Sequence, residues 1–86
     1  MLEPQYSNQA TKFLKNTDKI LAKRIIQKVE ELQENPVIHD TKTIQGYTDK
    51  VYRVRVGDYR ILYEIDYPNK ILGIIKIDKR LSLIHI

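Results

Sequence analysis

Apolar residues recur at helical spacing over two segments in the first half of the chain. The first segment spans residues 8–15, and its apolar face consists of Ala10, Phe13 and Leu14. Ser7 precedes it and can cap the helix N-terminus. The second segment spans residues 19–34, and its stripe consists of Leu21, Ile25, Ile26, Val29 and Leu32. Both patterns predict amphipathic helices.

The two predicted helices are separated only by Asn16-Thr17-Asp18, a sequence that breaks one helix and caps the next. Asn35-Pro36 ends the second helix, because a residue before proline is disfavoured in the helical conformation. A connection this short predicts an antiparallel helical hairpin lying across a sheet.

Strand patterns flank the helices. Residues 2–6 predict a short first strand, which Pro4 confines to a sheet edge. Three further strands are predicted at about 50–56, 59–66 and 70–78. The expected fold class is therefore α+β: an antiparallel-dominated sheet of about four strands with the helical hairpin packed on one face. Residues 1–86 are expected to form a single domain.

The hairpin at residues 51–65 concentrates arginines. If Gly57-Asp58 forms a two-residue type II′ turn, Val56 pairs with Tyr59 and Arg55 pairs with Arg60. Like charges directly opposite in a sheet are unfavourable, so this arrangement indicates an anion above them. The alternative is a solvated face on which Glu64 or Asp66 neutralises the arginines.

The next hairpin sets which residues share the arginine face. A three-residue turn would pair Asp66 with Lys70 and Ile61 with Ile75. Three tyrosines then point toward the helices and are expected to pack in the core: Tyr52, Tyr59 and Tyr63. The opposite face is expected to carry Arg53, Arg55, Arg60, Leu62, Glu64, Leu72, Ile74, Lys76, Asp78 and, by extension, Arg80.

Charge is distributed unevenly along the 86 residues. Residues 1–49 hold seven basic and seven acidic residues, whereas residues 50–86 hold eight and four, which accounts for the net charge of +4. The strands thus carry the excess charge, which favours a polyanionic partner, nucleic acid or an acidic protein segment, over a membrane.

Composition and motifs argue against several other classes of protein. The chain has no cysteine and only two histidines, His39 and His85, so neither a disulfide nor a metal-ligand cluster is expected. It has no apolar run of transmembrane length and no signal-peptide pattern, so a cytoplasmic protein is expected. No motif of Ser/His hydrolases, P-loop enzymes or glycosidases is present.

An arginine cluster has a chemistry of its own. The guanidinium group is always charged, and its planar fork of donors matches phosphate oxygens. Such a site can bind RNA, and it can also cleave RNA without a metal or cofactor. The ribose 2′-hydroxyl is itself the nucleophile, so the protein needs only to align it and to stabilise the charge developing on phosphorus.

The order strand, two helices and three strands, together with TIQGY, VYRVRVGDYRILYEI and ILGIIKIDKR, resembles the RelE/ParE superfamily of type II toxin–antitoxin toxins, and the RelE branch best. The resemblance covers nearly the whole chain. It implies a cytoplasmic endoribonuclease that cleaves mRNA, in many relatives at the ribosomal A site, without a metal, leaving a 2′,3′-cyclic phosphate. It also implies a RelB-like antitoxin from the same operon and a toxin–antitoxin hetero-oligomer.

The resemblance implies roles for individual residues. Arg53 and Arg55 match the basic pair that grips substrate phosphates, and Arg60 and Arg80 match arginines that stabilise the pentavalent phosphate. RelE relatives often carry a tyrosine about four residues after the last of these arginines, where this chain has Ile84. The residues themselves offer Lys76 and Lys79 as RNA backbone contacts. Some relatives place a histidine near the chain end as an acid or base, so the resemblance implies this role for His85, and an imidazole suits proton transfer at neutral pH.

Each assignment has a rival. Lys76 and Lys79 are also explained as solvated lysines, and His85 as a packing residue in an apolar tail. For the whole protein, the rivals are a ParE-like inhibitor of DNA gyrase and a catalytically degenerate module that only binds an antitoxin. The missing tyrosine favours the degenerate module, and the retained arginines favour the nuclease.

Overall fold

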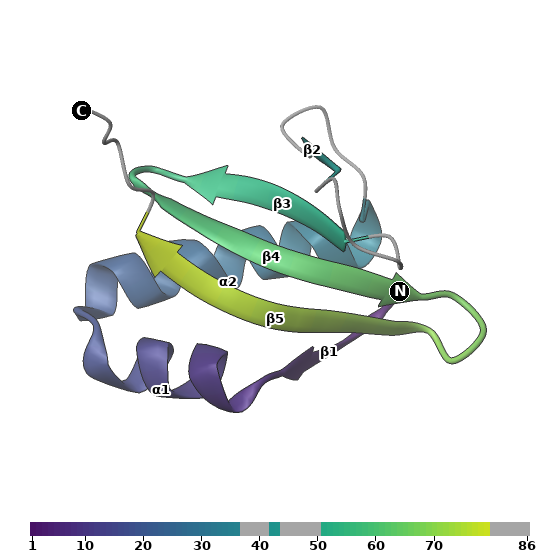
Figure 1. Cartoon of the computed structure of the whole chain (residues 1–86), viewed down its shortest axis with the longest axis horizontal. Helices are drawn as coiled ribbons and strands as arrows, with labels where there is room; N and C mark the ends of the chain where they lie inside the picture. The colour runs from purple at the N-terminus through teal and green to yellow at the C-terminus, as the bar shows by residue number, and fades with distance from the viewer. Residues whose placement is uncertain (37–41, 44–50, 80–86) are drawn as a thin grey trace.

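A computed structural model shows a five-stranded sheet with both helices on one side of it (Figure 1). It describes residues 1–36, 42–43 and 51–79. The elements are β1 (Glu3–Tyr6), α1 (Asn8–Asn16), α2 (Lys19–Glu34), β2 (Lys42–Thr43), β3 (Val51–Val56), β4 (Tyr59–Asp66) and β5 (Ile71–Lys79). The strand order is β1-β5-β4-β3-β2. Among the strand pairs of the described residues, only β1–β5 is parallel, so the expected α+β fold is confirmed, with β2 as an additional two-residue strand.

The helices form where the capping and apolar patterns predict. The Ser7 hydroxyl accepts a hydrogen bond from the backbone N–H of Ala10 (3.1 Å), and the Asp18 carboxylate accepts one from Leu21 (2.8 Å). Along α2 the buried residues are Leu21, Ile25, Val29 and Leu32. Ile26, which the sequence pattern adds to this stripe, is 40% exposed, so the stripe is narrower than predicted. Within the part of the chain that the structure describes, neither helix is long and apolar enough to cross a membrane.

The first hairpin has the predicted register. Val56 pairs with Tyr59 and Arg55 with Arg60. Gly57 has a φ of +60°, whereas Asp58 does not adopt a positive φ, which is the type II′ combination. A residue with a side chain at position 57 would be strained in this conformation.

The second hairpin corrects the predicted register. Asp66 pairs with Ile71 instead of Lys70, so the turn has four residues, Tyr67–Lys70, with Lys70 at a φ of +56°. The Asp66 carboxylate accepts hydrogen bonds from both the side chain and the backbone N–H of Asn69, at 2.8 and 3.2 Å. These bonds stabilise the longer turn, which the strand pattern alone did not reveal.

A β-bulge then shifts the pairing a second time. Tyr63 lies opposite Ile74 but Leu62 lies opposite Lys76, so Ile75 is an extra residue in β5. The Ser7 hydroxyl donates a hydrogen bond to the Ile75 carbonyl at 2.6 Å, which satisfies a backbone group of the bulge.

The longer turn and the bulge change the face assignment of β5. Leu72 and Ile74, predicted on the arginine face, are 0% and 1% exposed in the helix-side core. Ile71 and Ile75, predicted toward the helices, are only half-buried. The turn is one residue longer than predicted, so the β5 residues that follow it lie on the opposite face from the predicted one. The bulge inserts a second extra residue, so the residues after Ile75 lie on their predicted faces again. Lys76 therefore remains on the arginine face, as predicted.

The tyrosines pack as predicted. Tyr63 is fully buried, its ring stacks on that of Tyr52 at 5.6 Å, and its hydroxyl donates a hydrogen bond to the Pro36 carbonyl. Tyr59 meets Phe13 of α1 edge to face at 5.5 Å. The core interpretation of these tyrosines is therefore confirmed.

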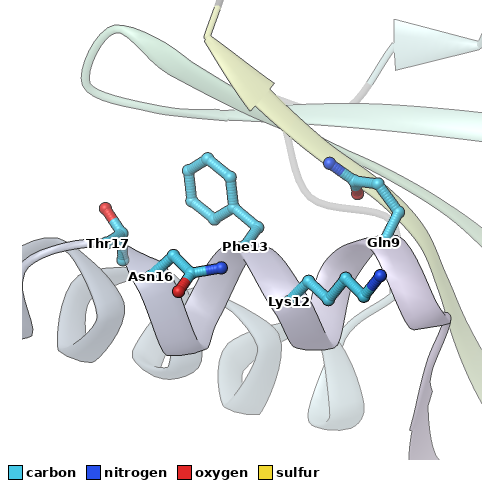
Figure 2. Close-up of a pocket in the computed structure, with 5 residues that line it drawn as sticks. All are labelled: Gln9, Lys12, Phe13, Asn16 and Thr17. Carbon is cyan, nitrogen blue, oxygen red and sulfur yellow. The ribbon is translucent and has the colours of Figure 1, made fainter.

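Side-chain hydrogen bonds from Ser7 and Gln9 connect the start of α1 to β5. Beyond the end of β1, the Gln9 amide donates to the Ile77 carbonyl (2.7 Å) and accepts from the Ile77 N–H (2.9 Å). Gln9 thus pairs with the edge of β5 as a further strand would. Figure 2 shows this side chain reaching β5 from α1.

Tyr6 gives the fold a dependence on alkaline pH. Burial, and secondarily the negative charge of Glu30, raises the pKa of the Tyr6 phenol above its ordinary value of 10. A raised pKa in the folded state stabilises the protein below pH 10, and this stability is lost as the pH rises through the folded-state pKa. We expect Tyr6→Phe to reduce the fall in unfolding free energy between pH 8 and pH 11.

Urea unfolding at the two pH values measures this difference. Tyr67→Phe is the matched control, because Tyr67 is 61% exposed. An equal fall in Tyr6→Phe and wild-type protein would show that Tyr6 does not contribute.

Candidate functional site

The face of the sheet away from the helices carries side chains in rows set by the strand register. The row nearest the β3–β4 turn consists of Arg55, Arg60 and Asp78. The next row consists of Arg53, Leu62 and Lys76. The structure therefore brings together four of the predicted site residues, and we call these two rows the cationic rows.

Acidic residues occupy the remaining rows of the same face. Glu64 lies opposite Gly73, and Asp66 lies opposite Ile71, which pairs in turn with Glu3. A Cβ atom on Gly73 would come within 3.1 Å of the Glu64 Cγ atom, so glycine leaves room for that side chain. The face is thus divided into a basic half at the β3–β4 turn and an acidic half at the other end.

Asp78 joins the two cationic rows. Its Oδ1 atom accepts a hydrogen bond from Arg60 Nε at 2.9 Å, and its Oδ2 atom lies 3.6 Å from Lys76 Nζ. The predicted alternative named Glu64 or Asp66 as the neutralising group, but Asp78 holds this position because the longer turn and the bulge together bring it opposite Arg60.

The Arg60–Asp78 bond orients the guanidinium group. Both side chains are about one-third exposed or less, at 33% and 26%, so the ion pair adds little net stability. The effect of the bond is to fix the orientation of the guanidinium group. Asp78 engages the Nε atom of Arg60, and the two terminal nitrogens have no partner among the described residues. Two such terminal nitrogens form a planar fork of donors that can bind phosphate oxygens.

Arg53 and Arg55 have no hydrogen bond or ion pair with residues 1–36, 42–43 or 51–79. Arg55 is exposed beside Arg60, and Arg53 is half-buried in the next row. The like charges of Arg55 and Arg60 therefore face each other as predicted, and of the three arginines only Arg60 is compensated by a carboxylate among the described residues.

The other predicted site residues lie elsewhere. Lys79 pairs with Tyr59, which places it on the helix side of β5, away from the cationic rows. Arg80 and His85 lie outside the described residues, as does Ile84 at the place of the missing tyrosine.

Comparisons with known proteins identify the family and the fold. Residues 5–83 match the family model described as the ParE toxin of the type II toxin–antitoxin system parDE. The chain belongs to the RelE/ParE family of toxins. The RelE1 protein of Methanocaldococcus jannaschii is 36% identical over 61 residues, covering 67% of each chain.

Solved structures of RelE toxins share the fold. The archaeal RelE–RelB complex from Pyrococcus horikoshii superposes with a TM-score of 0.82 at 27% identity, covering 95% of this chain and 98% of that one. The isolated E. coli RelE toxin gives a TM-score of 0.82 at 19% identity over 96% and 88% of the two chains, which shows the fold alone. This RelE/ParE-family chain is accordingly a toxin of a type II toxin–antitoxin system with a RelE-like structure.

Two residues near the cationic rows of this toxin were not identified from its sequence. Asp78 was placed on the correct face, but its contact with Arg60 depends on the bulge. Arg24 of α2 lies against the β3–β4 turn, with its Nη2 atom 3.3 Å from the position of a Cβ at Gly57. In the sequence, Arg24 belongs to an ordinary charged helix face, and no local pattern connects it to Gly57.

A separate surface pocket of this toxin lies along α1. It has a volume of about 290 Å³ and is lined by Gln9, Lys12, Phe13, Asn16 and Thr17 (Figure 2). Gln9 is engaged with β5 and Phe13 with Tyr59. The lining contains one cation and no carboxylate, so we assign this pocket no chemistry.

Proposed function

We propose that this toxin is an endoribonuclease that cleaves mRNA at the ribosomal A site and leaves a 2′,3′-cyclic phosphate. The observation that carries the proposal is the row of Arg55, Arg60 and Asp78. In this row the Arg60 guanidinium is oriented through Nε, and both its terminal nitrogens are available to an anion.

In the proposed reaction the ribose 2′-oxygen attacks phosphorus while its proton passes to a base. The bond from phosphorus to the 5′-oxygen breaks, and that oxygen receives a proton. Arg60 stabilises the charge on the pentavalent phosphate, and Arg53 and Arg55 hold the neighbouring phosphates. By family resemblance Arg80 assists Arg60, and His85 is the proposed acid or base.

The division of the sheet face into a basic and an acidic half supports a path for the RNA strand across the sheet. Phosphates are attracted to the cationic rows and repelled by Glu64 and Asp66 in the acidic half. We propose that the backbone crosses the sheet at its β3–β4 end. Lys76, which is exposed in the second row beside Asp78, can add a further phosphate contact, whereas Lys79 is on the other face.

We propose that a RelB-like antitoxin neutralises this toxin in the cytoplasm and that the two form a hetero-oligomer. The Pyrococcus horikoshii relative was solved as a RelE–RelB complex. The net charge of +4, carried by residues 50–86, suits an acidic partner segment.

The proposal is tested by adding the purified toxin to ribosomes translating a defined mRNA and mapping the cleaved ends. We expect cuts within the A-site codon that end in a 2′,3′-cyclic phosphate, and protection by the antitoxin encoded beside the toxin gene. An mRNA with a single 2′-deoxynucleotide at the cut site is the matched control and should resist cleavage. Cutting of that control would contradict attack by the 2′-hydroxyl.

The match to the ParE family model favours a second candidate, a ParE-like inhibitor of DNA gyrase. That function predicts inhibited DNA supercoiling and intact mRNA under the same conditions. If both activities are absent but the antitoxin binds, the degenerate binding module is the correct description. Growth arrest that depends on Arg80 would argue against such a module.

A further inference from the structure

The β3–β4 turn forms one wall of a second basic site. Strand β2 pairs only with Tyr52 and Arg53, so in the described part of the sheet the Val54–Val56 end of β3 is the edge. Beside this edge, a pocket of about 310 Å³ opens between α2 and the turn. Its lining includes Arg24, Lys28, Glu31, Arg55 and Gly57, and we call Arg24, Lys28 and Arg55 the edge site.

The edge site has an uncompensated positive charge. Lys28 Nζ and Glu31 Oε1 form an ion pair at 2.9 Å, which neutralises one cation. Arg24 and Arg55 have no ion pair with any described residue. Two arginines therefore line the pocket without a carboxylate of their own, a combination that attracts an anion.

Gly57 allows Arg24 to approach the turn. The Arg24 Nη2 and Nη1 atoms lie 3.3 and 3.5 Å from the position that a Cβ would occupy on Gly57. The absence of a side chain there lets a helix side chain rest against the hairpin, and the φ of +60° independently favours glycine.

Arg55 belongs to both basic regions. On the sheet face it lies opposite Arg60 in the first cationic row, and at the sheet edge it lines the pocket with Arg24. Arg55 therefore lies between Arg60 on the sheet face and Arg24 in the pocket lining, at the end of β3.

We propose that the edge site binds a phosphate of the RNA backbone next to the phosphates held on the cationic rows. The RNA strand would leave the sheet face at Arg55 and turn toward α2, with its next phosphate between Arg24 and Lys28. The inference rests on the proposed function, because it extends the path of the same substrate. Basic grooves that follow a backbone in this way bind single strands with little sequence preference.

The test measures binding of the full-length toxin to a single-stranded RNA oligonucleotide with 2′-O-methyl groups, which cannot be cleaved. Fluorescence anisotropy at several salt concentrations gives the affinity and its salt dependence. One phosphate contact contributes a slope of about 0.7 for single strands, so Arg24→Gln should lower the slope by about 0.7 and the affinity about fivefold at 0.1 M salt. Arg24→Lys should largely keep the slope.

Lys23→Gln is the matched control. It removes the same charge from the adjacent position of α2, but Lys23 lines a different groove with Ile26 and Glu30. Lys28→Gln is a second variant in the edge site and should also weaken binding. Thermal unfolding of each variant verifies that the fold is intact.

The outcomes separate the two proposals. A wild-type toxin that binds the RNA, with Arg24→Gln equal to Lys23→Gln, overturns the edge site and leaves the proposed function standing. A wild type without affinity for the free RNA overturns the edge site alone, because the proposed function is tested separately by cleavage on translating ribosomes. Unchanged RNA binding with weakened antitoxin binding in Arg24→Gln overturns the phosphate assignment and identifies a protein contact.

Discussion

Arg60→Ala is expected to reduce the single-turnover rate of mRNA cleavage by about 10²–10³-fold, the effect typical of losing one donor that stabilises transition-state charge. Arg60 is the one cation of the described rows that a carboxylate orients by a hydrogen bond, and its two terminal nitrogens have no described partner. Quenched reactions on ribosomes programmed with a defined mRNA measure the rate.

Three further variants show how much of the lost cleavage rate is due to the charge of Arg60, to its orientation, and to the general loss of a cation. Arg60→Lys keeps the charge but loses the planar fork, so we expect only partial recovery. Asp78→Asn keeps Arg60 but weakens the bond that orients it, so the loss should be smaller than in Arg60→Ala. Lys79→Ala removes a cation from the other face of β5 and should have little effect.

The same measurement tests Arg80, whose role rests on the family resemblance. We expect Arg80→Ala to lose a comparable fraction of the rate. Cuts that persist in both Arg60→Ala and Arg80→Ala would show that the roles assigned to these arginines are wrong. An equal loss in Arg60→Ala and Lys79→Ala would instead indicate general weakening by lost charge.

Ile74→Ala is expected to lower the free energy of unfolding by about 2–5 kcal/mol, because it empties a position that is 1% exposed in the core. Domains of this length are stable by only about 4–13 kcal/mol, so the loss is a large part of the total. Urea unfolding followed by circular dichroism measures it.

Ile75→Ala is the matched control for Ile74→Ala, since the same side chain is truncated one residue further along. Ile75 is the extra residue of the bulge and is only half-buried, so its truncation should cost clearly less. The register predicted from sequence, with Ile75 in the core and Ile74 on the arginine face, requires the opposite order. A larger loss in Ile75→Ala would therefore contradict the bulge.

The sequence by itself determined the elements whose causes are local. Ser7 and Asp18 cap helices within three residues of themselves, and α2 buries Leu21, Ile25, Val29 and Leu32 at the predicted spacing. The first hairpin also followed from sequence, because the two-residue turn at Gly57 fixes its register. Since side chains alternate along a strand, this register was enough to place Arg55 opposite Arg60.

Only the tertiary structure decided the features that depend on distant contacts. The four-residue turn and the bulge at Ile75 leave the alternation of β5 ambiguous in sequence, and the bulge carbonyl is satisfied by Ser7, far away in the chain. The longer turn places Leu72 and Ile74 in the core, and the turn and the bulge together bring Asp78 opposite Arg60. Likewise, Arg24 meets Gly57 only because α2 packs beside the edge of the sheet. A strand pattern reports which residues alternate, but packing against other elements sets where the alternation slips and which charges become neighbours.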